Sequence, residues 1–335
     1  MRVTNKMLSN SFLTDMRTNL QNMQTLQQQM TSGKEIRKPS DDPSKVARAM
    51  QLHTDINANK QFNENIEDTT NWLDTTDTAI GQAGDVLQRV RELMIQAGNA
   101  AYGDSERQSI KDEINQRIDQ FAQVLNTSFD GKYIFGGTRG TTKPLATKEV
   151  DSKIPEIVGK NNQIVYYSGD PSNIELTDTT SADYKQITSK MVVEISPGVT
   201  MDYSVSAKDI LEFTNSSSGT VTNIKISDIF TNIVDHLDNK ADVSKLNNED
   251  LSDITAAIDN MLKIRSEVGA KQNRMDSAQQ KNTDSNFNMT DILSKTEDID
   301  ITEKTMEFAN MQTVYLASLQ TSAKVIQPTL MDYMK

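Results

Sequence analysis

The sequence has no cysteine among its 335 residues, which excludes disulfide bonds and thiolate ligands for a metal. It has two histidines, His53 and His236, and neither stands in the HExxH arrangement of metalloproteases. No acidic cluster is set in an EF-hand loop, and no nucleophile lies beside a candidate base. We therefore expect a protein that is not an enzyme and that binds no metal or cofactor.

Positive charge and long apolar runs are also scarce. Lysine and arginine number 35 against 47 acidic residues, and the resulting net charge of −12 argues against a nucleic-acid partner. No apolar run approaches the roughly 18 residues of a membrane span, so we expect no membrane partner. The first residues, MRVTNKMLSNSFL, lack the apolar core and cleavage site of a signal peptide. They predict a cytoplasmic protein, or one exported without cleavage of its N-terminus.

Proline is rare, and its positions outline the architecture. Of the seven prolines, four fall between Pro144 and Pro197, and none lies between Pro43 and Pro144 or between Pro197 and Pro328. Because proline breaks helix interiors, we expect long helices in both flanks and a different fold in the middle. A chain of 335 residues suits two or three domains.

The N-terminal flank begins with a narrow apolar seam. Its members follow the alternating four and three spacing that is typical of coiled coils, with Asn19 in the one polar position. They are Phe12, Met16, Met23, Leu26 and Met30. The seam predicts either an ordinary amphipathic helix or, as we favour, a helix that pairs with the C-terminal helix.

The C-terminal flank, from about residue 299 to 333, carries a matching stripe. Ile301, Phe308 and Tyr315 stand seven apart, and Leu319 and Ile326 continue on the adjoining seam. Such a helix is incomplete alone, because another helix, from the same chain or a neighbour, must cover its stripe. We expect an assembly interface built from the N-terminal seam and from six residues of this helix: Ile301, Phe308, Met311, Tyr315, Leu319 and Ile326.

Longer helical segments lie inside these flanks. Asp42 and Pro43 are an N-cap followed by proline at the first helical position. The apolar residues beyond them recur at steps of seven: Ile66, Leu73, Ile80, Leu87 and Met94. Residues 105–108 read as a capping box that begins a shorter helix. A returning helix carries apolar residues on a three and four spacing: Leu251, Ile254, Ile258, Met261, Val268 and Met275.

The period changes in the middle of the chain. The tract FDGKYIFGGTRG (129–140) combines a tight turn with a short strand over 132–135, and it predicts a flexible junction. A phosphate-binding loop is disfavoured there because no GxxxxGK leads into a helix. From about 141 to 225 apolar and polar residues alternate, and residues 191–205 predict a β-hairpin.

These patterns predict a mainly α protein with an inserted β domain. We expect the N- and C-terminal halves to form a long antiparallel helical bundle or coiled-coil stalk, with the small β-rich domain at its far end. The expected parts are an N-terminal assembly helix (1–40), the ascending stalk (41–140), the β-rich outer domain (141–226), the returning stalk (227–284) and a C-terminal assembly helix (285–335).

Both flanks resemble the flagellin superfamily. Its N-terminal helices are matched by QQMTSGKEIRKPSDDPSKVARAM (28–50), LQRVRELMIQAGNA (87–100) and SIKDEINQRIDQF (109–121), and its returning helix by VGAKQNRMDSA (268–278). Within the superfamily, the start MRVTN, the tract FDGKYIFGGT and the end VIQPTLMDYM resemble the hook-associated proteins that join hook and filament. Region 141–226 has no match residue by residue.

The resemblance implies a secreted structural protein of the bacterial flagellum, exported through the type III apparatus and placed between hook and filament. It implies a ring of like subunits that contacts the other junction protein and flagellin. It also implies terminal regions, here about 1–40 and 285–335, that are unstructured in the monomer and form a coiled coil on assembly. A cytoplasmic export chaperone would shield Phe308, Tyr315 and Leu319 before secretion.

Two other functions stay open. A flagellin, the subunit of the filament itself, shares every helical feature, and its far greater copy number would distinguish it. A secreted binding module would act through the β domain, and ligand binding by that domain would favour it.

Overall fold

The computed structural model describes residues 5–99, 103–151, 160–171, 173–176, 178–215, 222–239 and 243–325. The chain divides into two compact units. Unit 1 comprises Met1–Lys60 with Thr283–Lys335, and unit 2 comprises Gln61–Asn282. Two long helices, α2 (Pro43–Ala97) and α8 (Leu251–Glu297), contribute residues to both units. Each unit is described by itself.

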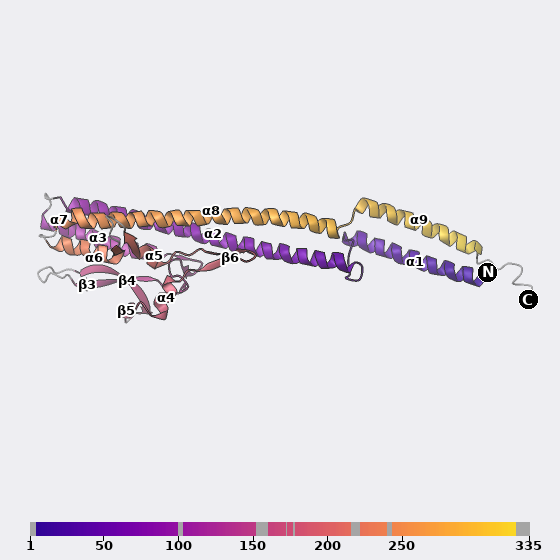
Figure 1. Cartoon of the computed structure of the whole chain (residues 1–335), viewed down its shortest axis with the longest axis horizontal. Coiled ribbons are helices and arrows are strands. Elements are labelled where there is room, and N and C mark those ends of the chain that lie inside the picture. Colours follow the sequence, from indigo (N-terminus) through magenta and orange to yellow (C-terminus); the bar gives the residue numbers. More distant parts are fainter. Residues whose placement is uncertain are drawn as a thin grey trace, which may run out of the picture. The chain divides into compact units, whose positions relative to one another are not determined.

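In unit 1, the terminal helices α1 (Asn5–Ser32) and α9 (Ile301–Val325) lie side by side (Figure 1). The prediction that the two terminal seams pair is therefore confirmed. The predicted N-cap of α2 is also present, because Asp42 Oδ1 accepts the backbone N–H groups of Ser44 and Lys45 at 3.0 and 3.1 Å. Beside these helices, Ala49, Ile56 and Leu293 form a small buried cluster between α2 and α8.

The turns that follow α1 and precede α9 are bonded to each other. The N–H of Ile299 donates to the carbonyl of Gly33 at 3.1 Å, and the N–H of Glu35 donates to the carbonyl of Glu297 at 2.6 Å. Lys34 Nζ lies 2.9 Å from Asp298 and 3.2 Å from Glu297. Gly33 has a φ of 71°, the left-handed conformation that commonly ends a helix at glycine. These bonds join the end of α1 to the start of α9.

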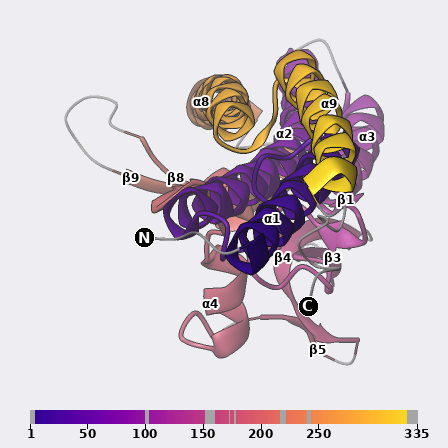
Figure 2. The ribbon, with the colours of Figure 1, turned by 90° about the vertical axis from the view of Figure 1, so that its right-hand side faces the viewer.

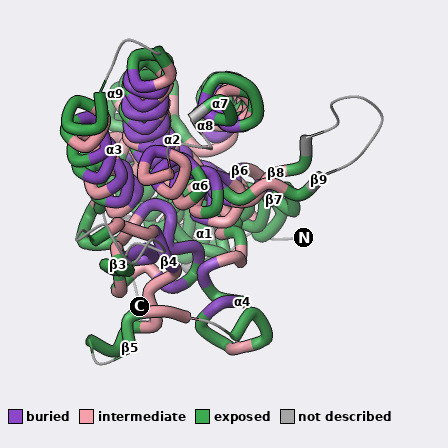
Figure 3. Tube along the Cα trace, turned by 90° about the vertical axis from the view of Figure 1, so that its left-hand side faces the viewer, coloured by how far each residue is buried: buried purple, intermediate pink, exposed green. Residues whose placement is uncertain are grey.

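Unit 2 is built around the buried face of α2. The heptad residues that the sequence predicted as its core, from Ile66 to Met94, are all buried. Helices α3 (Asp104–Leu125) and α6 (Ile226–Asp238) pack beside it, followed by α7 (Val243–Lys245), the π-helix η3 (Leu246–Asp250) and α8. Figure 3 shows the buried segments gathered along α2, α3 and α6.

The predicted capping box of α3 is wrong. The helix begins at Asp104, and its N-cap is Gly103, which offers no side-chain hydrogen bond. Asp104 and Glu106 in the first turn carry negative charge where the helix dipole is positive, and this favours the observed start.

The β segment of unit 2 consists of small antiparallel sheets. The first pairs β1 (Ser128–Phe129) with β2 (Lys132–Tyr133), and the second orders β3 (Leu145–Asp151), β4 (Lys160–Asp170) and β5 (Asn173–Glu175). A short helix, α4 (Ala182–Thr188), precedes the hairpin of β6 (Val192–Ser196) and β7 (Val199–Asp202). Helix α5 (Ala207–Leu211) then leads to a second hairpin, β8 (Glu212–Asn215) with β9 (Thr222–Lys225), which Figure 2 shows at one side of the ribbon. The predicted hairpin over 191–205 is confirmed.

The tract 129–140 is tightly packed, and the prediction of a flexible junction is wrong. The carbonyl of Phe135 accepts the N–H of Ala207 at 2.9 Å, and the carbonyl of Gln186 accepts the N–H of Thr138 at 3.0 Å. Gly137 has a φ of 58°, and a Cβ there would lie 2.5 Å from the carbonyl oxygen of Gln186. Four consecutive residues are buried: Ile134, Phe135, Gly136 and Gly137. The glycines therefore allow close backbone packing.

Helices and strands of unit 2 share one apolar core. Trp72 of α2 makes edge contacts with Phe129 and Tyr203, at centroid distances of 6.1 and 5.9 Å. Phe121 of α3 meets Phe230 of α6 at 5.6 Å. The single tryptophan of the chain is therefore a packing residue. None of the described helices is long and apolar enough to cross a membrane.

Candidate assembly surface

The contact between α1 and α9 brings together most of the predicted seam residues. On α1, Leu26 is buried, and four other seam residues are half-buried: Phe12, Met16, Met23 and Met30. On α9, Phe308, Met311 and Tyr315 are half-buried, and Lys304 and Ser318 continue their row at the same spacing. The apolar row of α1 and the apolar row of α9 cover each other within one chain, as in a pair of amphipathic helices.

Two predicted residues lie outside this contact. Ile301 is 64% exposed and Leu319 is 40% exposed, so neither is covered by α1. Ile326 lies outside the described residues. The stripe predicted from heptad spacing is thus divided between a face that packs within the chain and a face that does not.

A second set of apolar side chains is uncovered on the same two helices. We call it the outer apolar set: Met7, Leu13, Leu20, Ile301, Met306, Val314, Leu316 and Leu319. The heptad spacing predicted two of these residues, Ile301 and Leu319, and did not predict the other six. The signal was present, because α9 has apolar residues around most of its circumference, and a helix that needs only one partner has a single apolar stripe.

Charged groups at the junction of the helices are paired. The hydrogen bonds that Asp298 accepts from Ser294 and Lys34 lower the pKa of its carboxyl group. The hydrogen bond to Asp298 also raises the pKa of Lys34. Further along α9, Lys304 Nζ lies 2.8 Å from Glu307, and this hydrogen bond raises the lysine pKa. These exposed pairs orient side chains and contribute little to stability.

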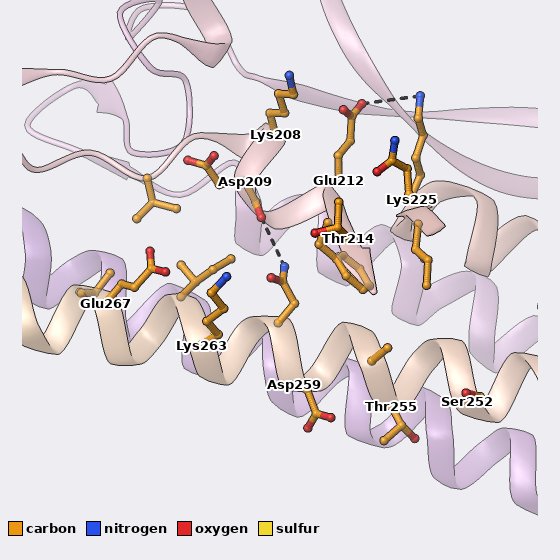
Figure 4. Close-up of a pocket in the computed structure, with 18 of the residues that line it drawn as sticks. Lys208, Asp209, Glu212, Thr214, Lys225, Ser252, Thr255, Asp259, Lys263 and Glu267 are labelled. Carbon is orange, nitrogen blue, oxygen red and sulfur yellow. Dashed lines mark hydrogen bonds and ion pairs between the residues drawn. The ribbon is translucent and has the colours of Figure 1, made fainter. Parts of the chain in front are cut away.

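Unit 2 has a large groove between α8 and the β8–β9 hairpin, with a volume of about 1120 Å³ (Figure 4). Its charges are mixed and partly satisfied. Lys225 lies 3.6 Å from Glu212, and Asn260 Nδ2 donates to the carbonyl of Asp209 at 3.3 Å. No histidine lines the groove, and within the described ranges no group of three or more His, Asp or Glu side chains could hold a metal ion.

Comparison with known protein families accounts for both flanks. Residues 3–139 match the bacterial flagellin N-terminal helical region, and residues 251–334 match the bacterial flagellin C-terminal helical region. Together the two regions cover well over half of the chain. The chain belongs to the bacterial flagellin family.

Individual relatives extend this likeness along the chain. A flagellin of Bacillus subtilis (strain 168) is 24% identical over 331 residues, which is 98% of this chain and 97% of the relative. Flagellar hook-associated protein 3 of Escherichia coli (strain K12) is 22% identical over 298 residues, or 87% and 86% of the two chains. Other flagellins match over only 29% to 37% of their own length.

The fold is that of a solved structure of a putative flagellar hook-associated protein from Vibrio parahaemolyticus. Its TM-score is 0.58 at 18% identity, and the match covers 77% of this chain and 100% of the other. At this identity the likeness establishes the fold alone.

Proposed function

We propose that this chain is a structural protein of the bacterial flagellum, and that copies of it form the junction between hook and filament. The outer apolar set carries the assembly part of this proposal, since its residues have no cover within the chain. The similarity to hook-associated protein 3 over most of both chains supports the junction position. The role is one of packing, and it needs no catalytic group.

The energetics of the terminal helices favour assembly over isolation. Fully burying a large apolar side chain contributes roughly 1.5–3 kcal/mol, whereas ordering the backbone costs roughly 1–2 kcal/mol per residue. The α1–α9 pair has one covered row of apolar residues, which scarcely offsets that cost. When neighbouring copies cover the outer apolar set as well, a second row contributes and the balance reverses.

Outward-facing substitutions test this proposal. Leu13→Asp on α1 and Leu316→Asp on α9 place a charge where a neighbour is expected, at residues that are 45% and 55% exposed in the single chain. Both variants should fold as the native chain does and should fail to incorporate into flagella. Val192→Asp is the matched control, because Val192 is an exposed apolar residue of the β6–β7 hairpin. Equal incorporation of all three variants, measured by immunoblotting of sheared flagella, contradicts the proposal.

The seam residues of α9 have a second role in our proposal. Before export, a cytoplasmic flagellar chaperone covers Phe308, Tyr315 and Leu319, two of which contact α1 in the folded chain and one of which is exposed. The chaperone and α1 then compete for the same face. Replacing Phe308 and Tyr315 by alanine should weaken binding to the chaperone of the same cell at least tenfold in calorimetry. Unchanged affinity contradicts this role.

The full-length match to a flagellin favours one other function, that of a filament subunit. The same terminal helices would then assemble along the whole filament. The position of the protein in intact flagella distinguishes the two functions, because a junction protein occupies a single short band.

A further inference from the structure

One aromatic side chain of unit 1, that of Phe287, is exposed to solvent. Of the nine phenylalanines in the chain, Phe287 of α8 alone is exposed, with 75% of its surface accessible. It stands on the face of the helix opposite to Met289 and Leu293, which pack toward α2. A large aromatic group in this position contributes nothing to the intrachain core, and its burial in a partner would remove a large apolar area from water.

Acidic residues flank Phe287 on the same helical face. Asp284 lies three residues before it and Asp291 lies four residues after it, spacings that make them its neighbours on the helix surface. Asp291 also pairs with Lys295 at 2.6 Å, and both side chains of that pair are well exposed. Phe287 with these two aspartates is called the knob below.

Unit 1 also has a small apolar hollow, of about 170 Å³, beside the turn between α1 and α2. Its lining includes five apolar residues: Ile36, Pro39, Val46, Ala49 and Met50. His53 and Glu297 also line it, and the Glu297 carboxylate is paired with Lys34 at 3.2 Å and with His53 at 3.1 Å. Met50 is 64% exposed at its edge. The hollow is open to solvent and has the chemistry to accept an apolar group.

The edge of the hollow is positively charged. Arg37 and Lys38 both line it, and both are exposed. The guanidinium of Arg37 donates to the amide oxygen of Gln28 at 2.6 Å, so it is not neutralised by that contact. The Asp41 carboxylate accepts the backbone N–H groups of Arg37 and Lys38 at 3.2 and 3.0 Å, which leaves both cationic side chains available for another acidic group. The hollow with these two cations is called the socket below.

We propose that the knob of one copy inserts into the socket of the next, with Phe287 among the apolar wall residues and its two aspartates facing Arg37 and Lys38. The apolar group matches the apolar lining, and the two aspartates are opposite in charge to Arg37 and Lys38. Because knob and socket are different parts of one chain, the contact is head to tail, and its repetition closes a ring or extends a helix. This inference rests on the proposed assembly of copies and names one of its contacts.

The absence of cysteine makes the contact testable by disulfide trapping. Thr290→Cys places a thiol beside the knob and keeps Phe287, and Ala47→Cys places one beside the socket and keeps Met50. Purified full-length chains carrying one substitution each are mixed and oxidised mildly. We expect heterodimers between the two variants in at least tenfold excess over those from Ala47→Cys mixed with Leu262→Cys, a control at another exposed position of α8. Far-ultraviolet circular dichroism checks that every variant keeps the helix content of the native chain.

Two further arms test the specificity of the contact. Adding Phe287→Ala to the Thr290→Cys chain should remove the excess, and the Asp284→Lys, Asp291→Lys pair should do the same. Arg37→Glu with Lys38→Glu in the other chain should restore trapping to the charge-reversed knob. Trapping that is insensitive to Phe287, or that matches the Leu262→Cys control, overturns the inference.

The result is independent of where the protein resides. Trapping is measured on purified chains, whereas the junction role is measured by position in intact flagella. Loss of trapping with a normal junction position would refute only the knob and socket, and trapping without that position would refute only the proposed function.

Discussion

A buried ion pair should decide much of the stability of unit 2. Lys111 of α3 places its Nζ 2.7 and 2.9 Å from the two carboxylate oxygens of Asp238 at the end of α6. Both side chains are 1% exposed. A cation and an anion removed from water to this extent depend on each other, because neither can be solvated when its partner is absent.

The magnitude follows from this geometry. Lys111→Met removes the buried cation of this pair, and the loss of one member of such a pair costs about 3–5 kcal/mol. That is a large part of the 5–15 kcal/mol by which domains are typically stable. Replacing both residues, as in Lys111→Met with Asp238→Leu, removes both charges, and we expect the double variant to recover most of the loss.

The single tryptophan provides the assay. Trp72 lies in the same apolar core as α3 and α6, so its fluorescence reports the unfolding of unit 2. Urea titrations of the native chain, of the single variants Lys111→Met and Asp238→Leu, and of the double variant give the free energies of unfolding by linear extrapolation. If Lys111→Met changes the free energy of unfolding by less than about 1 kcal/mol, or if the double variant is no more stable than the worse single variant, the reasoning about the buried pair is wrong.

Three other predictions use the same titration. Gly137→Ala should destabilise unit 2 by at least about 1–3 kcal/mol, because it combines a positive φ with a Cβ 2.5 Å from a carbonyl oxygen; a change below that range contradicts the packing of this tract. Arg265→Ala removes an ion pair with Asp77 at 2.8 Å, in which the arginine side chain is 50% exposed, and should cost less than about 1 kcal/mol. A loss of stability as large as that of Lys111→Met would refute the distinction between exposed and buried ion pairs. Burial raises the pKa of Asp253 above 3.8, so its ionisation opposes folding as the pH rises through the raised pKa. Asp253→Asn should therefore be more stable than the native chain at pH 7, with the difference vanishing below pH 3.8, and a pH-independent difference contradicts this.

The helical framework could be predicted because periodicity reports directly on burial. Ile66 and Met94 lie at the two ends of a heptad row, and both are fully buried. The pairing of α1 with α9 could be predicted because both helices carry a row of apolar residues at coiled-coil spacing. The β6–β7 hairpin was evident from strict alternation around a Pro-Gly turn.

Other features depend on long-range contacts that no local pattern encodes. Lys111 sits beside Ile110 in the sequence and gives no sign of being buried, because its partner is 127 residues away. The glycines of 129–140 suggested flexibility, whereas they permit backbone packing against α4. The outer apolar set was only partly predicted, because heptad spacing alone does not distinguish apolar residues that pack within the chain from those that stay exposed.

The position of the protein in intact flagella tests the proposed junction role most directly. An antibody against residues 141–226, applied with immunogold to intact flagella, should label a single band between hook and filament. The same band would indicate that the β segment is accessible from outside. Label along the whole filament would contradict the junction role and would identify the chain as a filament subunit.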